Sequence, residues 1–107
     1  MIAETMRVVE GAVMSTADKV HHALVFYSGR VQGVGFRYVT LQLARGYEVS
    51  GYAQNLSDGR VRVEVEGDQP EVDGFLAAIE DRMQGFVSQV EKVPGERMRQ
   101  FSGFTIR

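Results

Sequence analysis

Residues 29–37 read Gly-Arg-Val-Gln-Gly-Val-Gly-Phe-Arg and separate an apolar stretch over residues 23–28 from an amphipathic one. That arrangement is typical of a strand, a tight turn and a helix. Glycines at positions 33 and 35 can adopt the positive φ angles that point successive backbone N–H groups at one place. The helix that follows adds the positive end of its dipole. Residues 31–36 are therefore predicted to form a turn that can hold an anion.

Arg37 lies about one turn into the predicted helix, where a cation is disfavoured by roughly 0.3–1 kcal/mol. A bound phosphate would reverse that effect, because a guanidinium group pairs with two phosphate oxygens at once. The alternative is a turn that only reverses the chain, with Arg37 on a solvated helix surface. No Gly-Lys-Ser or Gly-Lys-Thr follows the turn, and the third glycine of a dinucleotide-binding motif is missing. The turn is therefore expected to hold a single phosphate-like group at most.

The remaining segments predict the order of strands and helices. Valines alternate with charged residues over 60–66, which indicates a strand that pairs with its predecessor through Leu-Ser-Asp-Gly at residues 56–59. A second helix is predicted to open at Pro70. The order β-α-β-β-α-β, with an optional extra C-terminal strand, predicts an α+β protein: a ferredoxin-like α/β sandwich with two helices on one face of an antiparallel sheet. The predicted strands cover residues 23–28, 49–55, 60–66, 86–93 and the surroundings of 104–106.

Composition bounds the class of protein. With 107 residues the chain has room for one domain, and we predict a flexible tail over residues 1–20 and a domain over residues 21–107. The formal charge of −2 is unfavourable for nucleic-acid binding, which depends on Lys and Arg. The absence of cysteine excludes disulfides and thiol catalysis. The first residues contain no continuous apolar segment, so we expect a cytoplasmic protein with no membrane partner, and we expect a monomer.

Several side chains with chemical potential have plainer interpretations. Tyr38 and Tyr52 could flank a ligand, but aromatic residues in such elements are expected to pack. His21 and His22 point to opposite faces of a strand, and no carboxylate spacing completes a metal site. The sheet face opposite the helices is predicted to be partly solvated, and it would carry Arg60, Arg62, Glu64 and Glu66.

Together, the turn and the hairpin resemble the acylphosphatase family. Two segments carry the resemblance: residues 29–37, and residues 51–55, which read Gly-Tyr-Ala-Gln-Asn and precede Asp58-Gly59. The resemblance covers about residues 22–107. One departure is Tyr52, which stands where the family usually has Trp.

The resemblance implies an enzyme that hydrolyses the carboxyl–phosphate bond of acyl phosphates and releases a carboxylate and inorganic phosphate. It also implies attack by water without a metal or another cofactor. By position, Arg37 and the backbone of the turn would bind the phosphate, and Asn55 would hold the attacking water. The predicted phosphate-binding residues are Val31, Gln32, Gly33, Val34, Gly35, Phe36 and Arg37.

Such chemistry needs few protein groups. Phosphoryl transfer passes through a loose transition state, for which positioning and charge stabilisation do most of the catalysis. The leaving carboxylate has a conjugate acid with a pKa of about 4, so it needs no general acid. A Ser/His/Asp set, a cysteine and paired carboxylates are then unnecessary.

Two alternatives stay open from the sequence. Asn55 ends a predicted strand before Leu-Ser-Asp-Gly, where an asparagine can simply serve the turn. The domain could also bind a phosphate- or carbamoyl-phosphate-like anion for a partner without turning it over. An RNA-binding module on the same kind of sheet is disfavoured, because its Lys/Arg-Gly-aromatic-Gly/Ala-Phe-Val-x-aromatic motif is missing.

Overall fold

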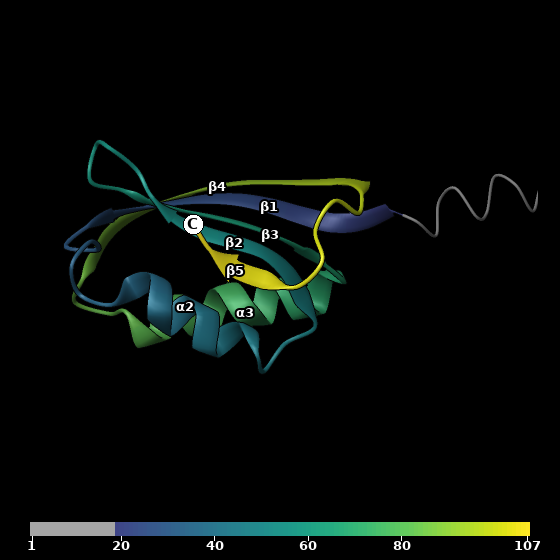
Figure 1. Cartoon of the computed structure of the whole chain (residues 1–107), viewed down its shortest axis with the longest axis horizontal. Coiled ribbons are helices and arrows are strands. Elements are labelled where there is room, and N and C mark those ends of the chain that lie inside the picture. The colour runs from purple at the N-terminus through teal and green to yellow at the C-terminus, as the bar shows by residue number, and fades with distance from the viewer. Residues whose placement is uncertain (1–18) are drawn as a thin grey trace, which may run out of the picture.

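The computed structural model describes residues 19–107, which form a five-stranded sheet with two helices on one of its faces (Figure 1). The predicted α+β, ferredoxin-like architecture is confirmed. The predicted tail lies outside the described residues, except that positions 19 and 20 already belong to the first strand. The elements are β1 (Lys19–Gly29), α2 (Phe36–Ala44), β2 (Val49–Asn55), β3 (Val61–Gly67), α3 (Gln69–Arg82), β4 (Val87–Met98) and β5 (Phe104–Ile106).

The sheet is mixed rather than fully antiparallel. Its strand order is β4-β1-β3-β2-β5, and every neighbouring pair is antiparallel except β2 and β5. The prediction of an antiparallel sheet is therefore wrong at this edge. The cause is topological: β1 and β2 run the same way, and β4 runs against them, so one reversal over residues 99–103 makes β5 parallel to β2.

The core lies between the sheet and the helices. Alternate residues of β1 and β3 face the helices and pair across the strands, as expected for a period-two pattern with one buried face. α3 buries one stripe against them, including Val72, Phe75 and Ile79. The sheet residues, each no more than 1% exposed, pair as Ala23 with Val65, Val25 with Val63, and Tyr27 with Val61.

The face opposite the helices is less solvated than predicted. Glu66 is completely buried, and its carboxylate accepts hydrogen bonds from the backbone N–H of Gln100, at 3.0 and 2.9 Å, and of Phe101, at 2.8 Å. The prediction of a wet surface is wrong for Glu66, because the connection between β4 and β5 supplies these donors. A buried carboxylate is tolerated only where such donors replace water.

Glu64 lies beside it on the same face in a second polar cluster. The Nε2 atom of His22 is 2.8 Å from the Glu64 carboxylate, and Arg97 Nη2 donates to the same oxygen at 2.9 Å. Burial alone would raise the pKa of Glu64, but hydrogen bonds from Tyr52, His22 and Arg97 hold it below its usual range. His22 is therefore half-buried against the ion pair of Arg97 and Glu64.

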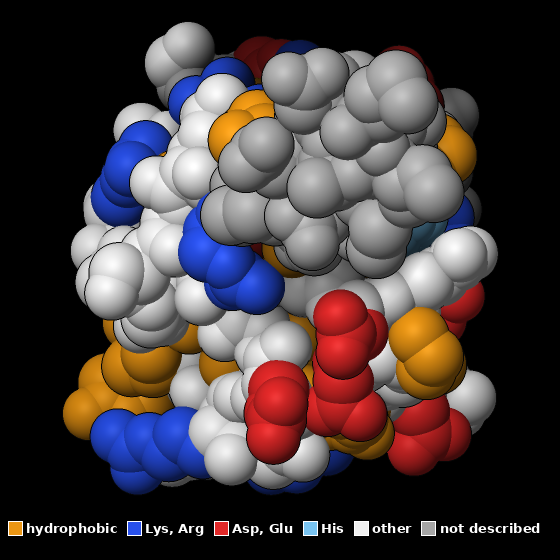
Figure 2. Space-filling view, turned by 90° about the vertical axis from the view of Figure 1, so that its right-hand side faces the viewer, with side chains coloured by type: hydrophobic (Ala, Val, Ile, Leu, Met, Phe, Trp, Pro, Cys, Tyr) orange, Lys and Arg blue, Asp and Glu red, His pale blue; other side chains and the backbone are white. Residues whose placement is uncertain are grey.

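One end of the molecule is shown in Figure 2, where acidic side chains gather towards the lower, helix-bearing side. Lys and Arg side chains are spread around them, and the view contains no broad basic surface. The charge pattern on this face agrees with the small negative net charge of the chain.

Replacing Glu66 by alanine should lower the free energy of unfolding by about 2–4 kcal/mol, because two backbone N–H groups lose the acceptor that replaces water. Urea denaturation followed by circular dichroism measures the change. Glu91→Ala is the matched control, since Glu91 is exposed on β4 and should change stability by roughly 0.5 kcal/mol or less. Equal effects of the two substitutions would contradict an anchoring role for Glu66.

Candidate functional site

The turn between β1 and α2 depends on two left-handed glycines. Gly33 has φ +77° and Gly35 has φ +81°, a region that L side chains rarely adopt. A Cβ atom built at either position would meet nothing within 4 Å. Backbone conformation rather than crowding therefore requires glycine, and the space beside both Cα atoms is open.

The helix behind this turn begins without a capping side chain. Gly35 is the N-cap residue of α2, and no acidic residue lies in the first turn. The N–H of Val39 donates to the carbonyl of Gly35 at 2.9 Å, so the three N–H groups before it have no partner within the helix. Within residues 19–107, the N–H groups of residues 31–35 donate no backbone–backbone hydrogen bond. Such a cluster of N–H donors favours an anion.

Gln32 ties the turn to the β2–β3 hairpin. Its Nε2 donates to the carbonyl of Leu56 at 2.7 Å and to that of Arg60 at 3.0 Å. Two bonds from one amide fix the hairpin loop against the turn, which sequence reasoning did not foresee because the residues are far apart in the chain. The Gln32 side chain therefore does not point into the candidate site.

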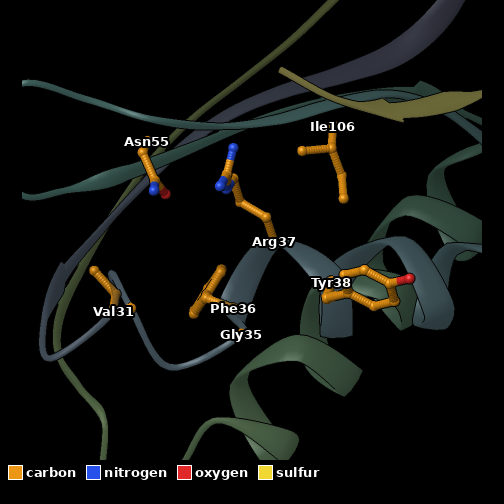
Figure 3. Close-up of a pocket in the computed structure, with 8 residues that line it drawn as sticks. Val31, Gly35, Phe36, Arg37, Tyr38, Asn55 and Ile106 are labelled. Atoms are coloured by element: carbon orange, nitrogen blue, oxygen red, sulfur yellow. The ribbon is translucent and has the colours of Figure 1, made fainter.

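A hollow of about 150 Å³ lies between the turn, the start of α2 and the ends of β2 and β5. Figure 3 shows Asn55 above the turn, and Arg37 between Asn55 and Ile106. Of the residues predicted to bind phosphate, Gln32 and Val34 do not line the hollow, and Val34 packs against the core. The lining residues are Val31, Gly33, Gly35, Phe36, Arg37, Tyr38, Asn55 and Ile106.

Arg37 is held in place by the C-terminal strand. Its Nη1 donates to the backbone carbonyl of Arg107 at 2.8 Å, and the N–H of Arg107 donates to the carbonyl of Ala53 at 2.8 Å. The pairing of β5 with β2 therefore positions the guanidinium group. A guanidinium group carries five N–H donors, so this contact leaves most of them for a ligand.

Asn55, the last residue of β2, is not used by the hairpin turn. The Leu56 backbone N–H donates to the Arg60 carbonyl at 2.8 Å and the Gly59 N–H donates to the Leu56 carbonyl at 3.2 Å. The Asp58 carboxylate completes the loop by accepting the Arg60 backbone N–H at 3.1 Å and the Arg60 Nε at 2.8 Å. These bonds, the backbone N–H first, lower the pKa of Asp58. The Asn55 side chain takes part in none of the hydrogen bonds found among residues 19–107, which disfavours the turn-chemistry interpretation.

Tyr38, Ile106 and Arg107 were not predicted at this site. Tyr38 is 65% exposed at the rim of the hollow, so the prediction that it packs is wrong, whereas Tyr52 is buried and packs on Phe101 as expected. For Tyr38, the only signal in the sequence of its place at this site was its position directly after Arg37. Ile106 and Arg107 gave none, because their proximity depends on the pairing of β5 with β2.

In the described part of the chain, no group of three or more His, Cys, Asp or Glu side chains is arranged to hold a metal ion. No helix between residues 19 and 107 has the length and apolar character needed to cross a bilayer.

The fold is that of a small ferredoxin-like protein, and its hollow brings backbone N–H groups, an arginine and an asparagine together. A sequence model of one family, the acylphosphatases, matches residues 23–106. The chain belongs to the acylphosphatase family.

Relatives and solved structures agree with this assignment. An acylphosphatase from Archaeoglobus fulgidus is 47% identical over 55 residues, which cover 51% of this chain and 62% of that relative. One from Methanospirillum hungatei is 38% identical over 82 residues, covering 75% of this chain and 89% of the relative. The structure of acylphosphatase from Bacillus subtilis matches with a TM-score of 0.75 at 27% identity, over 81% of this chain and 98% of that one.

Gln32→Ala should lower the free energy of unfolding by about 1–2 kcal/mol, because it removes two hydrogen bonds between the turn and the hairpin. Chemical denaturation measures the loss. Gln42→Ala is the matched control, since Gln42 is exposed on α2 and should shift stability by roughly 0.5 kcal/mol or less. A Gln32 variant as stable as the control would show that the bridge does not hold the two segments together.

Proposed function

We propose that this chain hydrolyses the carboxyl–phosphate bond of acyl phosphates at the hollow between the turn and β2, without a metal or another cofactor. The observation that carries the proposal is the convergence of three features on one cavity: the helix start with its free N–H groups, Arg37 and Asn55. Family membership supports the substrate class, since acylphosphatases act on acyl phosphates.

The phosphate is bound by the turn and by Arg37. Backbone N–H groups of residues 31–36 surround its oxygens, and the dipole of α2 adds a favourable potential. The Arg37 guanidinium pairs with the equatorial oxygens, on which charge is spread in the transition state. The bound phosphate also offsets the unfavourable interaction between the Arg37 cation and the positive end of the helix dipole.

Asn55 holds the attacking water. A water oxygen adds to phosphorus as the bond from phosphorus to the acyl oxygen breaks, and the carboxylate leaves with the electron pair of that bond. The proton released by the water ends on the phosphate product. Positioning supplies most of the acceleration, because the water arrives already oriented.

The lining of the hollow fits a leaving group that needs no proton. None of its residues is Asp, Glu or His, so the hollow offers neither a carboxylic acid nor an imidazolium as a general acid. A carboxylate leaves without one, because its conjugate acid has a pKa of about 4. An alcohol or amine leaving group would lack that advantage.

The alternative of a non-catalytic anion-binding module is not favoured. A phosphate cradle alone needs no free amide opposite it, yet Asn55 lies there unused by the hairpin. The match to the Bacillus subtilis acylphosphatase also covers nearly the whole of that chain. The monomeric state, the cytoplasmic location and the absence of nucleic-acid or membrane partners stay predictions.

Substitutions at Arg37 and at Asn55 should change different kinetic constants. Arg37→Ala should weaken inhibition by inorganic phosphate and lower kcat/KM by about 10³–10⁵, because Arg37 holds phosphate in ground and transition states alike. Arg37→Lys should stay severely impaired, since it loses the planar fork. Asn55→Ala should collapse kcat and leave the inhibition constant of phosphate near the wild-type value. Steady-state kinetics on benzoyl phosphate measures all three.

The reverse pattern would contradict these roles. If Asn55→Ala lost phosphate affinity while Arg37→Ala kept it, Asn55 and not Arg37 would bind the phosphate, and the proposed roles would be wrong. Gln42→Ala, remote from the hollow, should behave like the wild type in both measurements.

Turnover should be unaffected by chelators. Excess EDTA should leave kcat on benzoyl phosphate within about 20% of its value without chelator, since neither the leaving group nor the site calls for a Lewis acid. Loss of activity in EDTA, restored by Mg²⁺ or Zn²⁺, would overturn the metal-independent mechanism.

A further inference from the structure

Tyr38 is the one large side chain at the hollow that packs on little of the described chain. It is 65% exposed, although it lines the same cavity as Arg37 and Ile106. An aromatic ring held open to water at the rim of a binding site leaves apolar area for a ligand to cover. Ile106, half-buried on β5, adds a second apolar surface to the same hollow.

The two side chains lie on a definite side of the site. In Figure 3, Arg37 stands in the middle, Asn55 lies on one side of it, and Tyr38 and Ile106 lie on the other. Attacking and leaving oxygens are roughly in line in phosphoryl transfer. With water at Asn55, the acyl oxygen points away from Asn55, and Tyr38 and Ile106 line the part of the hollow on the far side of Arg37 from Asn55.

We propose that Tyr38 and Ile106 form a shelf for the acyl group and give the enzyme a preference for acyl phosphates with apolar, planar acyl groups. The inference rests on the proposed function, because it takes the water position from Asn55. A ring carried by the acyl group reaches the exposed Tyr38 ring and the Ile106 side chain. An acetyl group carries only a methyl beyond its carbonyl and covers far less of this surface.

The test is a comparison of two substrates, benzoyl phosphate and acetyl phosphate, in the wild type, Tyr38→Ala, Tyr38→Phe and Gln42→Ala. Tyr38→Ala should lower kcat/KM for benzoyl phosphate by about fivefold to tenfold, the size of one lost aromatic contact. It should lower kcat/KM for acetyl phosphate less than twofold. Tyr38→Phe keeps the ring and should therefore retain the wild-type preference for benzoyl phosphate. Gln42→Ala should match the wild type with both substrates.

The inhibition constant of inorganic phosphate separates the shelf from the phosphate site. It should be unchanged in Tyr38→Ala, because phosphate lacks an acyl group. Equal losses for both substrates, or none for either, in an active wild type would overturn the shelf and leave the proposed function standing. A wild type that hydrolyses neither substrate would overturn the proposed function and the shelf with it.

Discussion

The Glu66 carboxylate, buried on the sheet face opposite the helices, accepts backbone N–H groups of Gln100 and Phe101. These bonds anchor the connection between β4 and β5 at one end of the sheet. From that anchor the chain enters β5, pairs along β2 and brings the Arg107 carbonyl to Arg37. The orientation of Arg37 therefore depends on a contact made on the other side of the sheet. A carboxylate suits this task because it satisfies several donors at once in a place closed to water.

The site itself is assembled from two local structures that must be held in register. The turn supplies its N–H groups through left-handed Gly33 and Gly35, and the hairpin supplies Asn55. Gln32 joins them by donating to both sides of the hairpin loop. Backbone bonds and the Asp58 carboxylate close that loop, and the Asn55 side chain makes none of the hydrogen bonds found among residues 19–107. Catalysis by positioning requires such fixed geometry, since small displacements of the water or the phosphate are costly.

Particular residues show why one face of the sheet was predictable and the other was not. The alternating valines of β3 lie under the helices as their period requires, because burial of one face leaves a clear pattern. Glu66 carries the same alternation on the other face, yet it is buried by a segment more than thirty positions away. Charged residues give no sign of such cover, since the pattern is identical whether water or backbone N–H groups satisfy them. Glu64 was also predicted to face water, and for the same reason its contacts with His22 and Arg97 gave no sign in the sequence.

The sequence by itself determined the strand, glycine turn and helix, the hairpin whose first strand ends at Asn55, the valine core and the family to which the chain belongs. These are local properties: φ preferences of glycine, period-two and helical burial, and the spacing of a motif. Only the tertiary structure decided that β5 runs parallel to β2 and that the Arg107 carbonyl holds Arg37. It also decided that Gln32 bridges the turn and the hairpin, and that Tyr38 is exposed at the rim of the hollow. Each of these depends on segments distant in the chain meeting in space, and local pattern carries no information about which distant group will arrive.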